Sequence, residues 1–213
     1  GQMPYNIALD LYNNNTNILG THPDKIDNCE DRNRYSAMLD TIGVKQPEWS
    51  SLTNIEEAKE FCNNVGYPCL IRPSYVLSGA AMNVAYNENE LNSYLDQASN
   101  VSPEHPIVIT KFIDGAREID VDAVAKNGEI INWAISEHVE KGGVHSGDAT
   151  LVLPSQTIPK NTINIIKDNT QKIAQELNIT GPFNTQFLAK DNWVGVIETN
   201  LRASRSVPFV SKV

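Results

Sequence analysis

The sequence has few cysteines, and their arrangement offers no covalent or metal-based support for a fold. Three are present, Cys29, Cys62 and Cys69, an odd number without the close spacing of a zinc site. We therefore expect neither a disulfide framework nor a structural zinc ion. Cys62 falls in an amphipathic helical pattern and Cys69 in a strand pattern, where a buried, unreactive thiol is expected.

Basic charge and long apolar runs are also scarce. Lysine and arginine number 17 against 26 aspartates and glutamates, a net charge of −9. Nucleic acids and anionic membranes require a basic surface, so we expect neither as a partner, although a small anionic ligand needs only a few arginines and a metal. No apolar run approaches the ~20 residues of a spanning helix, and no signal-peptide pattern opens the chain. A cytoplasmic location is expected, with import into an organelle as an alternative.

The 213 residues mix helical and strand patterns in an order that predicts an α+β fold. A capping box, Thr53 and Glu56, opens one helix, and Asn127-Gly128 is typical of a type I′ hairpin turn. The expected helices cover residues 5–12, 27–42, 55–65, 87–98 and 161–178. The expected strands cover residues 18–20, 69–72, 82–86, 106–110, 118–125, 129–136, 151–153, 184–190 and 194–200.

The last two strands form the hairpin on which a functional prediction rests. If residues 191–193 make a three-residue loop, Gln186 lies directly opposite Glu198. Because side chains alternate, Gln186, Glu198 and Asn200 then share one face. The other, buried face would hold four apolar or small residues, Phe187, Ala189, Gly195 and Ile197.

A carboxylate and two amides on one face suit a hard cation held against a phosphate chain. Magnesium prefers oxygen ligands and keeps substrate phosphates in its shell. Arg202 and Arg205 follow directly, and arginine matches phosphate oxygens with two parallel hydrogen bonds. A half-exposed hairpin with a solvated polar face is the alternative interpretation.

Three further patterns carry weaker signals. Arg72 ends a strand before a small-residue loop in which backbone N–H groups could approach phosphate. Glu118 alternates with Asp120 and Asp122 on one strand face, where one functional acid among solvated ones is possible and a solvated face is favoured. His145 lies in a glycine-rich loop, as a candidate ligand-binding residue.

Four longer segments, taken together, resemble a known family. They read I-R-P-S-Y-V-L-S-G, K-F-I-D-G-A-R-E-I-D, G-V-H-S-G-D-A-T and I-E-T-N-L-R-A-S-R-S-V-P-F-V-S-K. In order and spacing, essentially the whole chain resembles the carbamoyl-phosphate synthase large chain. The wording is similar to the second of its two ATP-grasp halves, the one that phosphorylates carbamate. The resemblance implies an ATP-grasp fold and a ligase that uses ATP and Mg²⁺ or Mn²⁺.

The same resemblance implies roles for individual residues. Nucleotide phosphate contacts are implied for Arg32 and Arg72, and adenine or ribose contacts for Lys111, Ile113 and Glu118. Loop contacts to the nucleotide are implied for Gly143, Val144, His145 and Ser146. The metal ligands would be Gln186, Glu198 and Asn200, with Arg202 near the phosphate or carbamate. Among these, Asn200 and Arg202 are the expected catalytic residues, and His138 is assigned to structure.

Two departures from the bacterial pattern resemble the eukaryotic forms: Ser78-Gly79-Ala80 in place of Gly-Gly-Arg, and Leu201 in place of a proline. The resemblance implies four segments: 1–25 as part of a preceding α/β domain, 26–52 as a linker helix region, 53–105 as the small lobe and 106–213 as a large lobe that stops inside the fold. The implied partners are carbamate, a first ATP-grasp half and a glutaminase or ammonia source, in pyrimidine or arginine synthesis. The alternatives are another ATP-grasp carboxylate-amine ligase and a non-catalytic nucleotide-binding regulatory domain.

Overall fold

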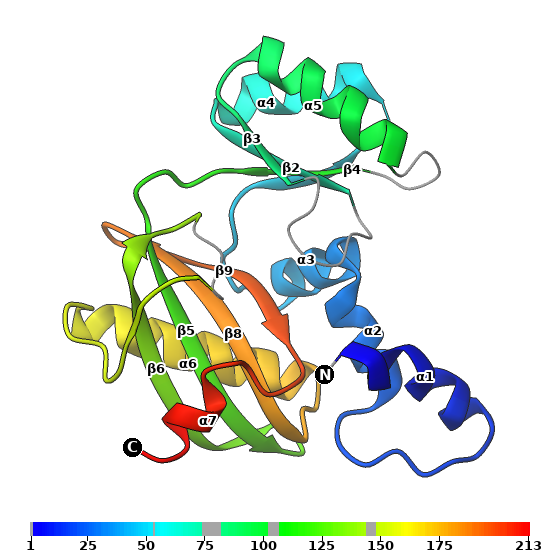
Figure 1. Cartoon of the computed structure of the whole chain (residues 1–213), viewed down its shortest axis with the longest axis vertical. Coiled ribbons are helices and arrows are strands. Elements are labelled where there is room, and N and C mark those ends of the chain that lie inside the picture. Colours follow the sequence, from blue (N-terminus) through cyan, green and yellow to red (C-terminus); the bar gives the residue numbers. More distant parts are fainter. Residues whose placement is uncertain (1, 53, 74–81, 102–106, 144–147) are drawn as a thin grey trace. The chain divides into compact units, whose positions relative to one another are not determined.

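A computed structural model describes residues 2–52, 54–73, 82–101, 107–143 and 148–213 (Figure 1). The chain divides into two compact units. The large unit comprises Gly1–Glu30, Ala37–Gln46 and Gly115–Val213, and the small unit comprises Asp31–Ser36 and Pro47–Asp114. In the described parts of the chain, no helix is both long and apolar enough to cross a membrane.

The large unit is built on a five-stranded antiparallel sheet in the order β7-β6-β5-β8-β9. Its strands are β5 (Arg117–Lys126), β6 (Glu129–Lys141), β7 (Leu151–Val152), β8 (Gly181–Lys190) and β9 (Trp193–Asn200). Helix α6 (Lys160–Glu176) covers one face of this sheet (Figure 1). Lys167 of α6 stacks on the ring of Trp133, 4.3 Å from its centroid, which identifies the covered face. The opposite face is free of α6 and carries the polar side chains of β5, β8 and β9.

Alternation along the central strands explains why α6 packs where it does. Ile119 lies opposite Phe187, and Ala123 opposite Phe183, and all four side chains are buried on the α6 side. The apolar stripe of α6, with Ile173 at its centre, is buried as well. Burying large apolar side chains on both layers drives this packing, at ~1.5–3 kcal/mol for each side chain.

The small unit is a four-stranded antiparallel sheet with two helices. The strand order is β1 (Trp49–Leu52), β4 (Ile107–Lys111), β2 (Cys69–Pro73) and β3 (Asn83–Ala85). The helices are α4 (Ile55–Val65) and α5 (Glu88–Val101), and both contribute to one apolar core that includes Cys62 and Cys69. Both thiols are free and fully buried, as expected of core cysteines.

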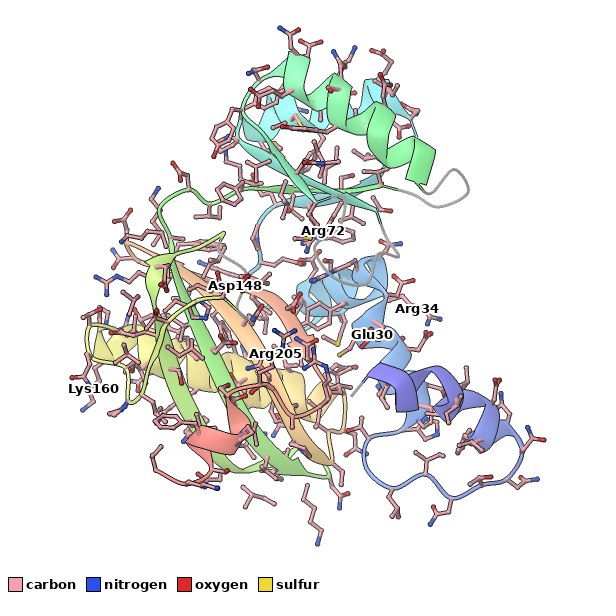
Figure 2. The ribbon with its side chains drawn as sticks, in the orientation of Figure 1. Glu30, Arg34, Arg72, Asp148, Lys160 and Arg205 are labelled. Carbon is pink, nitrogen blue, oxygen red and sulfur yellow. The ribbon has the colours of Figure 1, made fainter. Side chains whose placement is uncertain are left out.

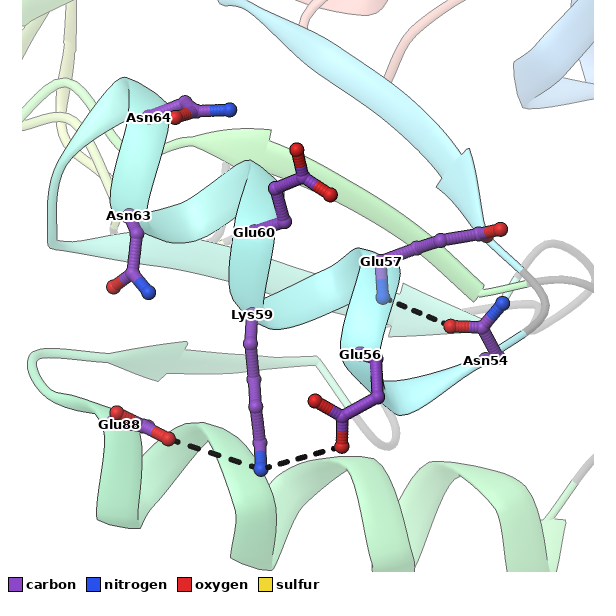
Figure 3. A pocket seen from close by; sticks show the side chains of 8 residues that line it. All are labelled: Asn54, Glu56, Glu57, Lys59, Glu60, Asn63, Asn64 and Glu88. Atoms are coloured by element: carbon purple, nitrogen blue, oxygen red, sulfur yellow. Dashed lines mark hydrogen bonds and ion pairs between the residues drawn. The ribbon is translucent and has the colours of Figure 1, made fainter.

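Helix α4 begins one residue later than its expected capping box requires. The cap is Asn54, whose side-chain oxygen accepts from the N–H of Glu57 at 2.8 Å (Figure 3). Thr53 lies outside the described residues. The hollow drawn in Figure 3 is an open surface lined by glutamates and asparagines, on which Lys59 pairs with Glu56 and Glu88, at 3.8 and 3.7 Å. Such exposed pairs are worth little, so we assign this surface no function.

The N-terminal region differs from the sequence-based expectation in three places. Helix α1 (Gln2–Asn13) contains the helix expected at 5–12 but begins at Gln2, within the expected loop, and residues 18–20 form no strand. The single helix expected at 27–42 is two helices, α2 (Pro23–Glu30) and α3 (Arg32–Thr41), separated at Asp31. The Asp31 side chain accepts from the N–H of Arg34 at 3.0 Å, a capping contact that starts a new helix rather than continuing the old one.

The β5–β6 turn gives a stability prediction with an internal control. Gly128 has a φ of +80°, and a Cβ there would lie 3.0 Å from Gln175 Cα and 3.2 Å from Ala174 O, both backbone atoms of α6. Gly115 has a φ of +71° with no atom within 4 Å of such a Cβ. Gly115→Ala should therefore cost only the left-handed strain of ~1–2 kcal/mol, and Gly128→Ala clearly more, measured by urea denaturation. Equal losses would show that α6 yields easily at this contact.

Candidate functional site

The β8–β9 hairpin brings the expected side chains together. Gln186 lies opposite Glu198, and Asn184 opposite Asn200. The pairing is the expected one, but the loop that produces it is not. Lys190 pairs with Trp193, so the loop has two residues, and a register shift next to Gln186 restores the pairing.

That register shift is a β-bulge at Ile197. A two-residue loop by itself would have placed Ile197 opposite Gln186 and turned Glu198 toward α6, since one residue of slip reverses every side chain. The bulge inserts one residue on β9 and returns Glu198 to the polar face. The expected apolar face is accordingly wrong in part. Val194 and Val196, in place of Gly195 and Ile197, pack with Phe187 and Ala189.

The acidic side chains of β5 lie on this same polar face, and they are buried. Glu118, Asp120 and Asp122 are 5%, 3% and 4% exposed, so the solvated-face interpretation is wrong for all three. In register, Asp120 lies opposite Gln186 and Asp122 opposite Asn184. Buried carboxylates require partners, because an isolated buried charge is very costly.

His138 and Asn184 supply those partners. His138 Nε2 lies 2.6 Å from Asp120 Oδ2, with both side chains almost fully buried. The Asn184 amide nitrogen donates to Asp120 Oδ1 and to Asp122 Oδ1, each at 3.1 Å. Asn184 thus bridges two carboxylates that would otherwise repel each other. The assignment of His138 to structure agrees with this contact.

The charges on this face shift two pKa values. Burial raises the pKa of the Glu118 carboxyl; the charge of His138 opposes this shift, and those of Asp120 and Glu198 add to it. Burial lowers the pKa of His138, but its hydrogen bond to Asp120 and the charges of Asp120, Glu118 and Glu140 outweigh this effect, so the net pKa shift is upward. The site therefore has an excess of negative charge and favours a bound cation.

The expected metal-binding side chains form a hydrogen-bonded series along β9. Asn200 Nδ2 donates to Glu198 Oε1 at 3.0 Å, and Arg202 Nη2 donates to Asn200 Oδ1 at 3.3 Å. Both oxygens that would hold a cation are oriented by neighbours from the same strand end. Arg205, labelled in Figure 2, is exposed on the same loop.

The donor set fits magnesium that arrives with a nucleotide. Among the described residues, no group of three or more His, Cys, Asp or Glu side chains could hold a metal by itself. One carboxylate, Glu198, with the amide oxygens of Gln186 and Asn200, leaves coordination positions for phosphate oxygens. Magnesium is usually bound in this way, through one or two carboxylates plus substrate phosphates.

Comparison of the sequence with known proteins identifies the family of this chain. The family model described as carbamoyl-phosphate synthase L chain, ATP binding domain, matches residues 31–213. The chain belongs to this family. It is 62% identical over 213 residues to the multifunctional protein pyrABCN of Emericella nidulans, and 59% identical over 212 residues to the mitochondrial carbamoyl-phosphate synthase [ammonia] of Rattus norvegicus. All of this chain is covered, but only 9% and 14% of those relatives.

Solved structures show the fold of this carbamoyl-phosphate synthase domain. A biotin carboxylase from Campylobacter jejuni in complex with β-γ-ATP aligns with a TM-score of 0.77 at 19% identity, covering 96% of this chain and 47% of its own. A D-alanine–D-alanine ligase from Bacillus anthracis complexed with ATP aligns at 0.69 and 19%, covering 92% and 62%. At such identities the likeness concerns the fold, and it confirms the expected α+β ATP-grasp architecture.

The remaining expected nucleotide contacts of the synthase domain are divided between the two units. Glu118 and Gly143 lie in the large unit, as do the expected metal-binding side chains. The small unit holds Arg32 at the start of α3, Arg72 in β2, Lys111 at the end of β4 and Ile113 just after it. Val144, His145 and Ser146 lie outside the described residues.

Lys111 has a structural contact beside its expected role. Its Nζ donates to the carbonyl oxygens of Gly66 and Tyr67, at 2.8 and 2.9 Å. These carbonyls follow the C-terminus of α4, where the negative end of the helix dipole also favours a cation. The structure therefore holds the β4 end against the α4–β2 connection through this lysine.

Sequence reasoning missed two residues that the structure places in the site. Asn184 was expected only as a strand residue, and Ser206 only as part of a family-like segment. Ser206 Oγ donates to Asp122 Oδ2 at 2.5 Å and lies 2.7 Å from Ser204 Oγ. A signal for Asn184 was present, since N-T-Q in β8 alternates like D-V-D in β5.

Proposed function

We propose that this chain phosphorylates carbamate with ATP to form carbamoyl phosphate, as the second ATP-grasp half of a carbamoyl-phosphate synthase. The observation that carries the proposal is the face on which Gln186, Glu198, Asn200 and Arg202 lie together beside buried acids. Identity of 56–62% over the whole chain to carbamoyl-phosphate synthases and to multifunctional proteins such as pyrABCN supports the choice of reaction.

The chemistry needs charge compensation rather than a base. Carbamate is already an oxyanion, so its attack on the γ-phosphorus requires no proton removal. The obstacle is repulsion between two anions. Arg202 and Arg72 would each supply positive charge to the phosphates, and Gln186, Glu198 and Asn200 would hold Mg²⁺, or Mn²⁺ in its place. When bound, the metal neutralises charge on the phosphate oxygens.

The other residues act by binding and orienting. Asn200 keeps the Glu198 carboxylate in place, and Arg202 orients the Asn200 amide. Glu118, Lys111 and Ile113 would contact the adenine or ribose. Arg32 would contact the nucleotide phosphates, and Gly143 would make a loop contact to the nucleotide. Carbamate, a bicarbonate-phosphorylating half and an ammonia source are the proposed partners. The cytoplasm is the proposed location, with mitochondria as the alternative because the Rattus norvegicus relative is mitochondrial.

The reverse reaction tests this proposal. The chain would replace the matching segment of pyrABCN, and ATP formation from Mg-ADP and carbamoyl phosphate would be followed by luciferase. We expect synthesis at a rate comparable to that of the unaltered relative, and none with acetyl phosphate. Synthesis from another acyl phosphate alone would favour a different ATP-grasp ligase. Binding of ATP by the chain without any synthesis would favour a regulatory domain.

A further inference from the structure

The loop after β9 is fastened to the sheet by a carboxylate that the proposed reaction does not use. Asp122 is 4% exposed and accepts from Ser206 Oγ at 2.5 Å through one oxygen. Its other oxygen accepts from Asn184, at 3.1 Å. Asn184 in turn lies directly opposite Asn200. One buried aspartate therefore connects the strand beside the metal-binding side chains to the loop that follows them.

Ser206 makes this contact in place of the capping hydrogen bond that a serine at its position usually forms. It is the N-cap residue of α7 (Val207–Val210), a position where a serine hydroxyl usually accepts from a backbone N–H of the first turn. No side-chain capping bond is formed here. The hydroxyl points instead to Asp122, with Ser204 Oγ 2.7 Å away. A hydrogen bond to a charged group is about twice as strong as a neutral one, which explains the exchange.

Arg202 lies on the segment held between two anchors. Upstream, its guanidinium donates to Asn200 Oδ1 of β9, at 3.3 Å. Downstream, the backbone is fixed four residues later by the Ser206–Asp122 contact. A loop fixed at both ends holds the guanidinium near one position before any ligand arrives. Such preorganisation increases affinity and rate because little ordering remains to be done on binding.

We propose that Asp122 and Ser206 are positioning residues that hold Arg202 for the terminal phosphate of ATP. The proposal rests on the function proposed above. It assigns Asp122 and Ser206 an action through Arg202, without contact to the substrate. Because Arg202 is expected near the transferred phosphoryl group, loosening the loop should weaken binding of ATP more than of ADP.

The experiment compares Mg-ATP and Mg-ADP affinities of the 213-residue chain by isothermal titration calorimetry. Ser206→Ala removes the hydroxyl that donates, and Asp122→Asn weakens the acceptor without changing its shape. Ser206→Thr is the conservative variant, because it keeps a hydroxyl at this position. Thr185→Val is the matched control. Thr185 Oγ1 of β8 lies 3.0 Å from Thr199 Oγ1 of β9, and both side chains are buried on the α6 face of the sheet.

We expect Ser206→Ala and Asp122→Asn to weaken ATP binding about tenfold, the size of one charged hydrogen bond, while ADP binding changes less than about twofold. Ser206→Thr should recover most of the ATP affinity. Thr185→Val should lower the melting temperature and leave the ATP-to-ADP ratio unchanged. Equal weakening of both nucleotides, or no weakening, would overturn the positioning role alone. A wild-type chain that bound neither nucleotide would overturn the proposed function and this inference with it.

Discussion

Replacing Glu198 by glutamine should abolish ATP formation from carbamoyl phosphate while leaving the fold intact. Glutamine has the same shape, and its side-chain oxygen can still accept from Asn200 Nδ2, which donates to Glu198 Oε1 in the native chain. What disappears is the one carboxylate charge among the three expected metal ligands. Losing one well-placed electrostatic group at a reacting centre costs about 10²–10³ in rate, so the assay should fall near its background.

The rate of ATP formation and the binding of the metal would be measured on the same variants. Electron paramagnetic resonance of Mn²⁺ with ADP should show the bound ion in the native chain and its loss in Glu198→Gln. Glu137→Gln is a suitable control, because Glu137 is also buried, at 7% exposure, and accepts from the Thr157 N–H at 3.1 Å. That variant should lose some stability and keep synthesis. Undiminished synthesis in Glu198→Gln would refute the metal assignment.

Replacing Asp120 by alanine should be the most destabilising single change on the polar face. It would leave buried His138 without its 2.6 Å partner, and the Asn184 amide would keep only its hydrogen bond to Asp122. Removing one member of a buried ion pair typically costs ~3–5 kcal/mol of unfolding free energy. Asp24→Ala is the control, since the His22–Asp24 pair is exposed and should contribute at most ~1 kcal/mol. Urea denaturation near pH 6 would measure both.

The same pair predicts a pH dependence of stability. The pKa of His138 is raised in the folded protein, so the folded protein binds this proton more tightly than the unfolded chain does. Its contribution is fully present below the ordinary pKa of 6.5 and is lost as pH rises through the raised value. Asp120→Asn should reduce this loss, because the raising charge is gone. An NMR titration of His138 that showed no downward shift in that variant would contradict the assignment.

Much of the fold could be predicted because its signals are local. The helical stripe of α6, the Asn127-Gly128 turn and the alternation along β5 and β8 each depend on neighbours within a few residues. The break between α2 and α3 and the Asn54 cap were missed, since each depends on one side chain choosing a backbone partner. Short capping contacts of this kind compete closely with their alternatives.

The site shows the limit more clearly. Sequence alone determined the family, because residue types and their spacing along the chain carry that information, and it predicted which side chains would bind a metal and phosphate. Only the tertiary structure decided how they meet. A two-residue loop with a bulge at Ile197, not a longer loop, sets Glu198 opposite Gln186. The burial of Asp120 and Asp122, their bridging by Asn184 and the Ser206–Asp122 hydrogen bond required strands and a loop far apart in sequence to come together. The alternation of side chains along a strand predicts which face of the sheet each one occupies. Whether that face is exposed to solvent or buried depends on the segments of the chain that pack against it.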